Sequence, residues 1–218
     1  MVSTKLVDNT IPAIELRLKS FSGDMVRIEY LENCLKQILP NDVKRFCHLK
    51  LADFYANRLM WTSAAKNMDL AVETATTYKD KINYCLKEIS LLIKANDYIL
   101  IDKPYKKAMN SAGTPKEKED IKNYLKTQLT KQAEDFEKKN KRSNASSIYQ
   151  RILEIYGLVN EQEKKQILEK LANLNAKLGR IREAKSYETM LSKPITVPRD
   201  PETNVKKVDW KDLGIDFY

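Results

Sequence analysis

The stretch "LADFYANRLMWTSAAKNMDLA", residues 51–71, decides the fold of this chain. It contains no glycine or proline, yet its apolar and small residues follow one helical phase up to Leu59 and another from Trp61 onward. A change of phase without a helix breaker predicts two helices joined by a very short turn, which forces them to run antiparallel. Small residues at Ala64 and Ala71 let the two helix axes approach closely. The stretch therefore predicts a tight helical hairpin.

The second helix of this hairpin has counterparts along the chain. Ala64, Ile101, Ala145 and Ala184 each stand three residues beyond a predicted turn, and they are separated by 37, 44 and 39 residues. Self-similarity at such a period is typical of solenoids. Sustained period-two alternation, which would indicate a sheet, is absent from the sequence. We therefore predict an all-α chain of about ten helices, arranged as stacked antiparallel hairpins.

Helix start and stop signals support this division. "TPKE", residues 114–117, predicts a helix start with a capping box between Thr114 and Glu117. Asn160 and Glu163 repeat that pattern for a later helix.

Weaker signals mark the remaining ends. Gly179 is expected to close a helix with a left-handed turn. Side-chain N-caps are expected at Thr62 or Ser63 and at Ser143, and Pro104 indicates either a kink or a delayed helix start.

The predicted packing positions resemble those of the tetratricopeptide repeat family. The residues that carry the repeat are Leu51, Ala52, Tyr55, Trp61, Ala64, Met68, Ala71, Tyr98, Tyr105, Ala108, Ala145, Tyr149, Leu171, Ala172, Gly179 and Ala184. The resemblance implies a right-handed solenoid whose first helices line a concave groove for a protein or peptide partner. It also implies three parts, namely a capping hairpin over 1–40, the repeats over 41–192 and an extended tail over 193–218.

The positive charge of the chain gathers in its middle. The formal net charge is +9, and residues 103–142 hold twelve basic and six acidic residues. The candidate anion-binding residues there are Lys103, Lys106, Lys107, Lys138, Lys139, Lys141 and Arg142. A solvated, lysine-rich surface explains such a pattern, and so does attraction to RNA or a ribonucleoprotein.

Histidine and cysteine offer little for catalysis or metal binding. Cys47 and His48 are neighbours on a predicted helix, so their side chains point about 100° apart and cannot act together. Cys34, Cys47 and Cys85 form no Cys-x-x-Cys pair, and a reducing compartment suits them. The sequence shows neither a signal peptide nor an apolar run of about 20 residues. We therefore expect a soluble, cytoplasmic protein without a metal or cofactor and without membrane insertion.

The chain ends in a proline-containing segment with an apolar terminus. Its candidate docking residues are Trp210, Leu213, Ile215, Phe217 and Tyr218. So many apolar residues predict docking, either on this protein's own groove or on a partner.

These observations favour a non-enzymatic adaptor or scaffold that binds proteins inside a larger intracellular assembly. The alternative is a protein that binds RNA or the ribosome through the basic face around residues 103–142. Oligomeric state does not follow from the sequence.

Overall fold

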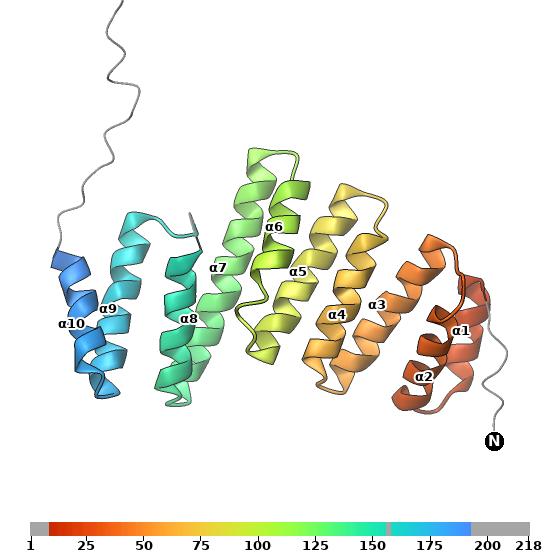
Figure 1. Ribbon diagram of the computed structural model, residues 1–218, viewed down its shortest axis with the longest axis horizontal. Helices are drawn as coiled ribbons and strands as arrows, with labels where there is room; N and C mark the ends of the chain where they lie inside the picture. The colour runs from red at the N-terminus through yellow and green to blue at the C-terminus, as the bar shows by residue number, and fades with distance from the viewer. Residues whose placement is uncertain (1–8, 156–157, 193–218) are drawn as a thin grey trace, which may run out of the picture.

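The computed structural model describes residues 9–155 and 158–192, and these contain ten helices and no strand (Figure 1). The helices are α1 (Ile11–Ser20), α2 (Asp24–Leu35), α3 (Asn41–Asn57), α4 (Trp61–Glu73), α5 (Tyr78–Ala95), α6 (Asp102–Ser111), α7 (Pro115–Lys138), α8 (Arg142–Glu154), α9 (Glu161–Lys177) and α10 (Ile181–Ser192). The prediction of an all-α chain of about ten helices is confirmed. The candidate docking residues between Trp210 and Tyr218 lie outside the described residues.

Consecutive helices pack as antiparallel hairpins. The pairs are α3 with α4, α5 with α6, α7 with α8, and α9 with α10, and successive pairs touch through α4 with α5, α5 with α7, and α8 with α9. Figure 1 shows the helices following one another along an elongated, arched row, so helices distant in the sequence are distant in space. The right-handed sense implied by the resemblance stays a prediction.

One turn geometry joins the two helices of each of these four hairpins. Leu59, Asn96, Asn140 and Gly179 follow the first helices with φ of 60°, 61°, 55° and 74°. Each donates its N–H to the carbonyl three residues earlier, and the next residue donates to the carbonyl five residues earlier. These are the two hydrogen bonds of a Schellman motif. The repeat positions identified from the sequence each lie five residues after one of these left-handed residues, namely Ala64, Ile101, Ala145 and Ala184.

The helices that follow these turns begin without the side-chain caps expected from the sequence. Met60 is the N-cap of α4 and Lys141 is the N-cap of α8, and neither makes a side-chain capping bond. The expected caps at Thr62 or Ser63 and at Ser143 are therefore wrong. The reason is that Met60 and Lys141 already occupy the N-cap positions. Each of them donates the second hydrogen bond of the Schellman motif and is at the same time the N-cap of the next helix.

The other helix start and end signals predicted from the sequence are confirmed. Thr114 Oγ1 accepts from the backbone N–H of Glu117 at 3.1 Å, and the Glu117 carboxylate accepts from the Thr114 N–H at 3.2 Å. Asn160 caps α9 in the same way, and Gly179 adopts the left-handed turn. Pro104 lies in the first turn of α6, where no backbone N–H is needed, so the delayed helix start is the alternative that the structure takes.

Leu59 is the least suitable residue type among the four left-handed positions. Its side chain is 69% exposed, so its replacement loses little packing. We expect Leu59→Gly to raise the free energy of unfolding by about 0.5–1 kcal/mol, because an L-residue is strained at this φ and glycine is not. Gly179→Ala is the converse control, since open space surrounds its Cβ position and only the backbone strain changes. Urea denaturation measures both, and a Leu59→Gly variant less stable than the wild type would contradict the turn geometry.

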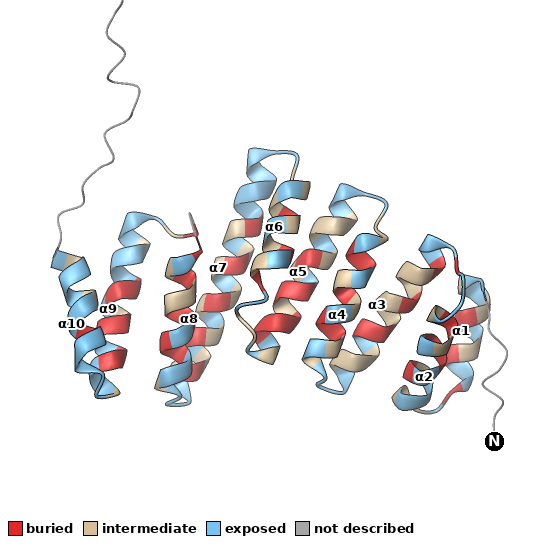
Figure 2. Ribbon diagram, in the orientation of Figure 1, coloured by how far each residue is buried: buried red, intermediate tan, exposed pale blue. Residues whose placement is uncertain are grey.

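The buried side chains form one long core with smaller cores beside it. The largest cluster runs from Ala52 of α3 to Leu174 of α9 without interruption. A second cluster joins α1 and α2 to α3, and Tyr55 packs against both. Figure 2 shows the buried residues on the sides of the helices that face their neighbours. A core that extends along the row is what stacked hairpins produce.

Most of the residues that carry the repeat lie in these cores. The buried ones are Leu51, Ala52, Ala64, Met68, Ala71, Ala108, Ala145, Tyr149, Leu171, Ala172 and Ala184. Tyr55, Trp61, Tyr98 and Tyr105 are partly buried and pack against the largest cluster. Gly179 is in a turn and contributes conformation instead of packing.

Candidate functional site

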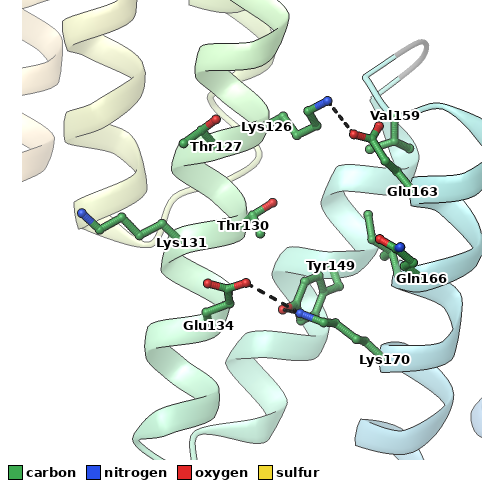
Figure 3. A pocket seen from close by; sticks show the side chains of 11 residues that line it. Lys126, Thr127, Thr130, Lys131, Glu134, Tyr149, Val159, Glu163, Gln166 and Lys170 are labelled. Carbon is green, nitrogen blue, oxygen red and sulfur yellow. Dashed lines mark hydrogen bonds and ion pairs between the residues drawn. The ribbon is translucent and has the colours of Figure 1, made fainter.

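A cleft lies between α7 and α9, with α8 at its floor (Figure 3). We call it the α7–α9 cleft. Its volume is about 440 Å³, and it is lined by Lys126, Thr127, Thr130, Lys131, Glu134, Tyr149, Val159, Glu163, Gln166, Ile167 and Lys170. First helices of consecutive hairpins therefore form its two walls.

Ion pairs fix the separation of the two walls. Lys126 of α7 donates to Glu163 of α9 at 2.8 Å, and the other Glu163 oxygen accepts from the backbone N–H of Asn160 at 3.0 Å. The capping residue of α9 therefore also ties that helix to α7. Lys126 and the backbone N–H lower the pKa of Glu163, because both bonds favour the ionised carboxylate. The Lys126–Glu163 ion pair is already formed in this structure, so the two walls need no rearrangement there before a ligand binds.

Tyr149 anchors the floor of the cleft. Its ring is buried, and its hydroxyl donates to Glu137 at 2.6 Å and accepts from Lys170 at 2.9 Å. Lys170 also lies over the Tyr149 ring, 5.0 Å from its centroid, and pairs with Glu134 at 3.8 Å. Burial and the adjacent Glu137 carboxylate raise the pKa of Tyr149, so the phenol stays protonated. The lower half of the cleft is thus a fixed network of α7, α8 and α9.

Four polar side chains of the cleft remain unpaired. Thr127, Thr130 and Lys131 of α7 and Gln166 of α9 make no side-chain hydrogen bond or ion pair within the part of the chain that the structure describes. Figure 3 shows Thr127 and Thr130 on α7 and Gln166 on α9 above the Tyr149 network, whereas the Lys131 side chain extends from α7 on the side away from α9. Thr127, Thr130 and Gln166 provide hydroxyl and amide groups that suit a peptide backbone.

The structure divides the candidate anion-binding residues into two sets. On α6, Lys103 and Lys107 both donate to Asp69 of α4, at 2.6 and 2.8 Å, and Lys107 also pairs with Glu73. These two cations therefore have acidic partners, whereas Lys106 beside them is exposed.

The second set surrounds the turn between α7 and α8. Lys138, Lys139, Lys141 and Arg142 form no ion pair with any described residue. Lys141 does lie over the Phe136 ring, 6.0 Å from its centroid. These four cations gather at one turn, and none of them lines the α7–α9 cleft.

Cys47 and His48 do not act together. The Cys47 side chain lies within the core of α1, α2 and α3, and burial raises the pKa of its thiol to about 12. His48 points instead toward α4, where its Nδ1 is 3.0 Å from the Asn67 side-chain oxygen. Over residues 9–155 and 158–192, no group of three or more His, Cys, Asp or Glu residues could hold a metal ion. In the same ranges, no helix is both long and apolar enough to cross a membrane.

Comparison with known proteins gives no family assignment. No family model and no curated protein matches the chain. Among solved structures, MamA 41-end from Desulfovibrio magneticus RS-1 is 13% identical, with a TM-score of 0.37 over 83% of this chain and 90% of that one. The MamA RS-1 ArsTM double mutant is 12% identical, with a TM-score of 0.37 over 83% and 89%. BtubC (BKLC) from P. vanneervenii is 12% identical, with a TM-score of 0.35 over 82% and 75%. At these TM-scores the likeness carries no functional weight, and the description of the fold rests on the contacts of this chain.

Proposed function

We propose that the protein is a non-enzymatic, tetratricopeptide-like adaptor that holds a segment of a partner protein in the α7–α9 cleft. The observation that carries the proposal is the set of unpaired polar side chains Thr127, Thr130 and Gln166 on walls already fixed by ion pairs. A site whose walls are pre-arranged loses little entropy when a ligand binds. Two threonines and a glutamine match the hydrogen-bonding needs of an extended backbone.

The same architecture suggests a role for the N-terminal hairpin. Leu39 precedes the proposed boundary at residue 40 and Val43 follows it, yet both belong to the core shared by α1, α2 and α3. We propose that the hairpin of α1 and α2, within the predicted capping unit of residues 1–40, covers one side of α3, because the end of a solenoid otherwise exposes apolar surface.

A photo-crosslinking experiment tests the peptide-binding proposal. A photoreactive amino acid replaces Gln166, which is exposed at the cleft, and in a matched variant it replaces Ser147, which is exposed on α8. In the native cell, the Gln166 variant should give a discrete protein adduct that survives nuclease treatment. The Ser147 variant should not give that adduct. Equal adducts from both positions would contradict a cleft-specific partner.

The unpaired basic turn supports RNA binding as the second candidate function. Lys138, Lys139, Lys141 and Arg142 crowd four cations into five positions. If they bind phosphate, the affinity for single-stranded RNA should fall steeply with salt, and a variant with all four changed to Gln should lose most of that slope. A filter-binding titration between low and physiological salt measures this. A flat salt dependence in the wild type would exclude the candidate.

A further inference from the structure

A second cleft lies on the opposite layer, between α4 and α6 with α5 at its floor. We call it the α4–α6 cleft. Its volume is about 430 Å³, and α4, α5, the α5–α6 connection and the start of α6 contribute to its lining. It shares no residue with the α7–α9 cleft.

Glu88 of α5 lines this cleft and is the unusual group in it. Its side chain is only 5% exposed, and its Oε2 has no hydrogen-bond partner. An unpaired buried carboxylate is costly, so native proteins normally provide a partner. Here the partner is missing from the described part of the chain.

The neighbouring charges do not supply that partner. On α4, Asp69 and Glu73 are occupied by Lys103 and Lys107 of α6. The other acid of the lining, Asp102, is bound by Arg151 of α8. The nearby acids and cations thus form ion pairs with one another, and none of these pairs includes Glu88.

Three further titratable groups belong to the surroundings of Glu88. Lys66 of α4 is exposed and forms no ion pair among the described residues. Cys85 is buried on α5, and burial together with the nearby Glu88 raises the pKa of its thiol. On α7, Tyr124 donates its hydroxyl to the backbone carbonyl of Leu86 on α5 at 3.4 Å. None of these groups neutralises the Glu88 carboxylate.

Apart from Thr62, the rest of the lining is apolar. Ala65 and Leu92 form its buried part, and Ile99 and Leu100 stand at its rim, where they are 79% and 51% exposed. An aliphatic chain passing between these side chains would cover apolar surface that water now contacts. Its charged end would then lie next to the Glu88 carboxylate.

We propose that the α4–α6 cleft binds a lysine or arginine side chain of a partner protein, with the cationic head on Glu88 and the aliphatic stem against Leu92, Ile99 and Leu100. The geometry matches both parts of such a side chain, since lysine and arginine combine an apolar stem with a charged head. This site is independent of the peptide proposed for the α7–α9 cleft, and neither proposal requires the other.

Proton linkage gives the proposal a distinctive signature. Burial first, and the nearby Asp69 second, raise the pKa of Glu88 to about 8. A bound cation favours the ionised carboxylate, so at neutral pH its binding must release a proton. The affinity for a cation should therefore rise about tenfold between pH 7 and pH 9 and level off above the Glu88 pKa.

The full-length protein is titrated with n-butylammonium and with n-butylguanidinium, and binding is followed by two-dimensional NMR at pH 7 and pH 9. Saturable shifts at the α4–α6 cleft with the tenfold rise in affinity are expected, and the tighter of the two probes identifies the natural side chain. Glu88→Gln should abolish the binding, while Glu169→Gln, at an exposed acid of α9, should leave it unchanged. Circular dichroism verifies that both variants are folded.

Three results would overturn the proposal. They are failure of both cations to bind at pH 9, equal binding of the uncharged n-butanol, and unchanged cation binding in a folded Glu88→Gln variant. None of these results bears on the crosslinking experiment at Gln166, so failure of this site and failure of the proposed adaptor function are distinguishable.

Discussion

Glu88→Gln should make the protein more stable at pH 9, by about 3–5 kcal/mol, an order-of-magnitude figure from a pKa moved from 4.5 to about 8. Glutamine keeps the shape of the side chain and removes the charge that burial makes unfavourable. At pH 4 both side chains are neutral, so the two proteins should differ little.

The sign of this pH dependence of stability follows from the number of protons that the folded and unfolded states bind. In the unfolded chain Glu88 loses its proton near pH 4.5, whereas in the folded chain it keeps it up to about pH 8. Within this window the folded state binds more protons, so the contribution of Glu88 is fully present below pH 4.5 and is lost as the pH rises. The wild type should therefore lose up to about 1.4 kcal/mol per pH unit relative to Glu88→Gln.

Urea denaturation of both proteins at pH 5, 7 and 9 measures the effect. Glu169→Gln is the matched control, because that carboxylate is exposed and its loss should leave the pH profile parallel to the wild type. If Glu88→Gln also gave a profile parallel to the wild type, Glu88 would not be a buried, unpaired acid.

Ala145→Leu should lower the free energy of unfolding by about 1–3 kcal/mol, the usual range for overpacking a core. Ala145 is fully buried on α8 and belongs to the continuous core of the row. The added carbons have no space unless α8 moves away from its neighbours. Such a movement would also disturb Tyr149 and the floor of the α7–α9 cleft.

The control for this prediction is on the same helix. Ser147 is exposed, so Ser147→Leu tests the same introduced side chain without overpacking. Its free energy of unfolding should stay within about 0.5 kcal/mol of the wild type. If Ala145→Leu were equally harmless, the helices of this hairpin would not be closely packed at that position.

The parts of the fold that follow from local chemistry were predictable. The capping boxes of Thr114 with Glu117 and of Asn160 with Glu163 each depend on residues within one helical turn. Glycine identified the turn at Gly179. The equivalent turn at Leu59 could be placed only from the phase change, because leucine carries no signal for a left-handed conformation.

The candidate sites were harder to predict. The basic residues were visible from composition, but the pairing of Lys103 and Lys107 with Asp69 joins hairpins more than thirty residues apart in the sequence. Thr127, Thr130 and Gln166 are ordinary surface residues until α7 and α9 are placed side by side.

Glu88 did leave a signal that the sequence interpretation missed. In the fifth helix the buried stripe passes through Cys85, Ile89 and Leu92, and Glu88 stands on that stripe one turn from Leu92. A charged residue at a position where helical periodicity requires an apolar one indicates a functional or strained site.

The central claim is that consecutive hairpins stack in an open row. It is tested most directly by spin-label distances from Asp53 on α3 to Lys87 on α5, Thr127 on α7 and Glu169 on α9 in turn. These four positions are exposed and the native cysteines are buried, so introduced cysteines can be labelled selectively. The distance should increase at each step, by about one helix diameter of 10 Å or more. A distance to Glu169 equal to or shorter than that to Thr127 would mean a closed bundle and would contradict the account.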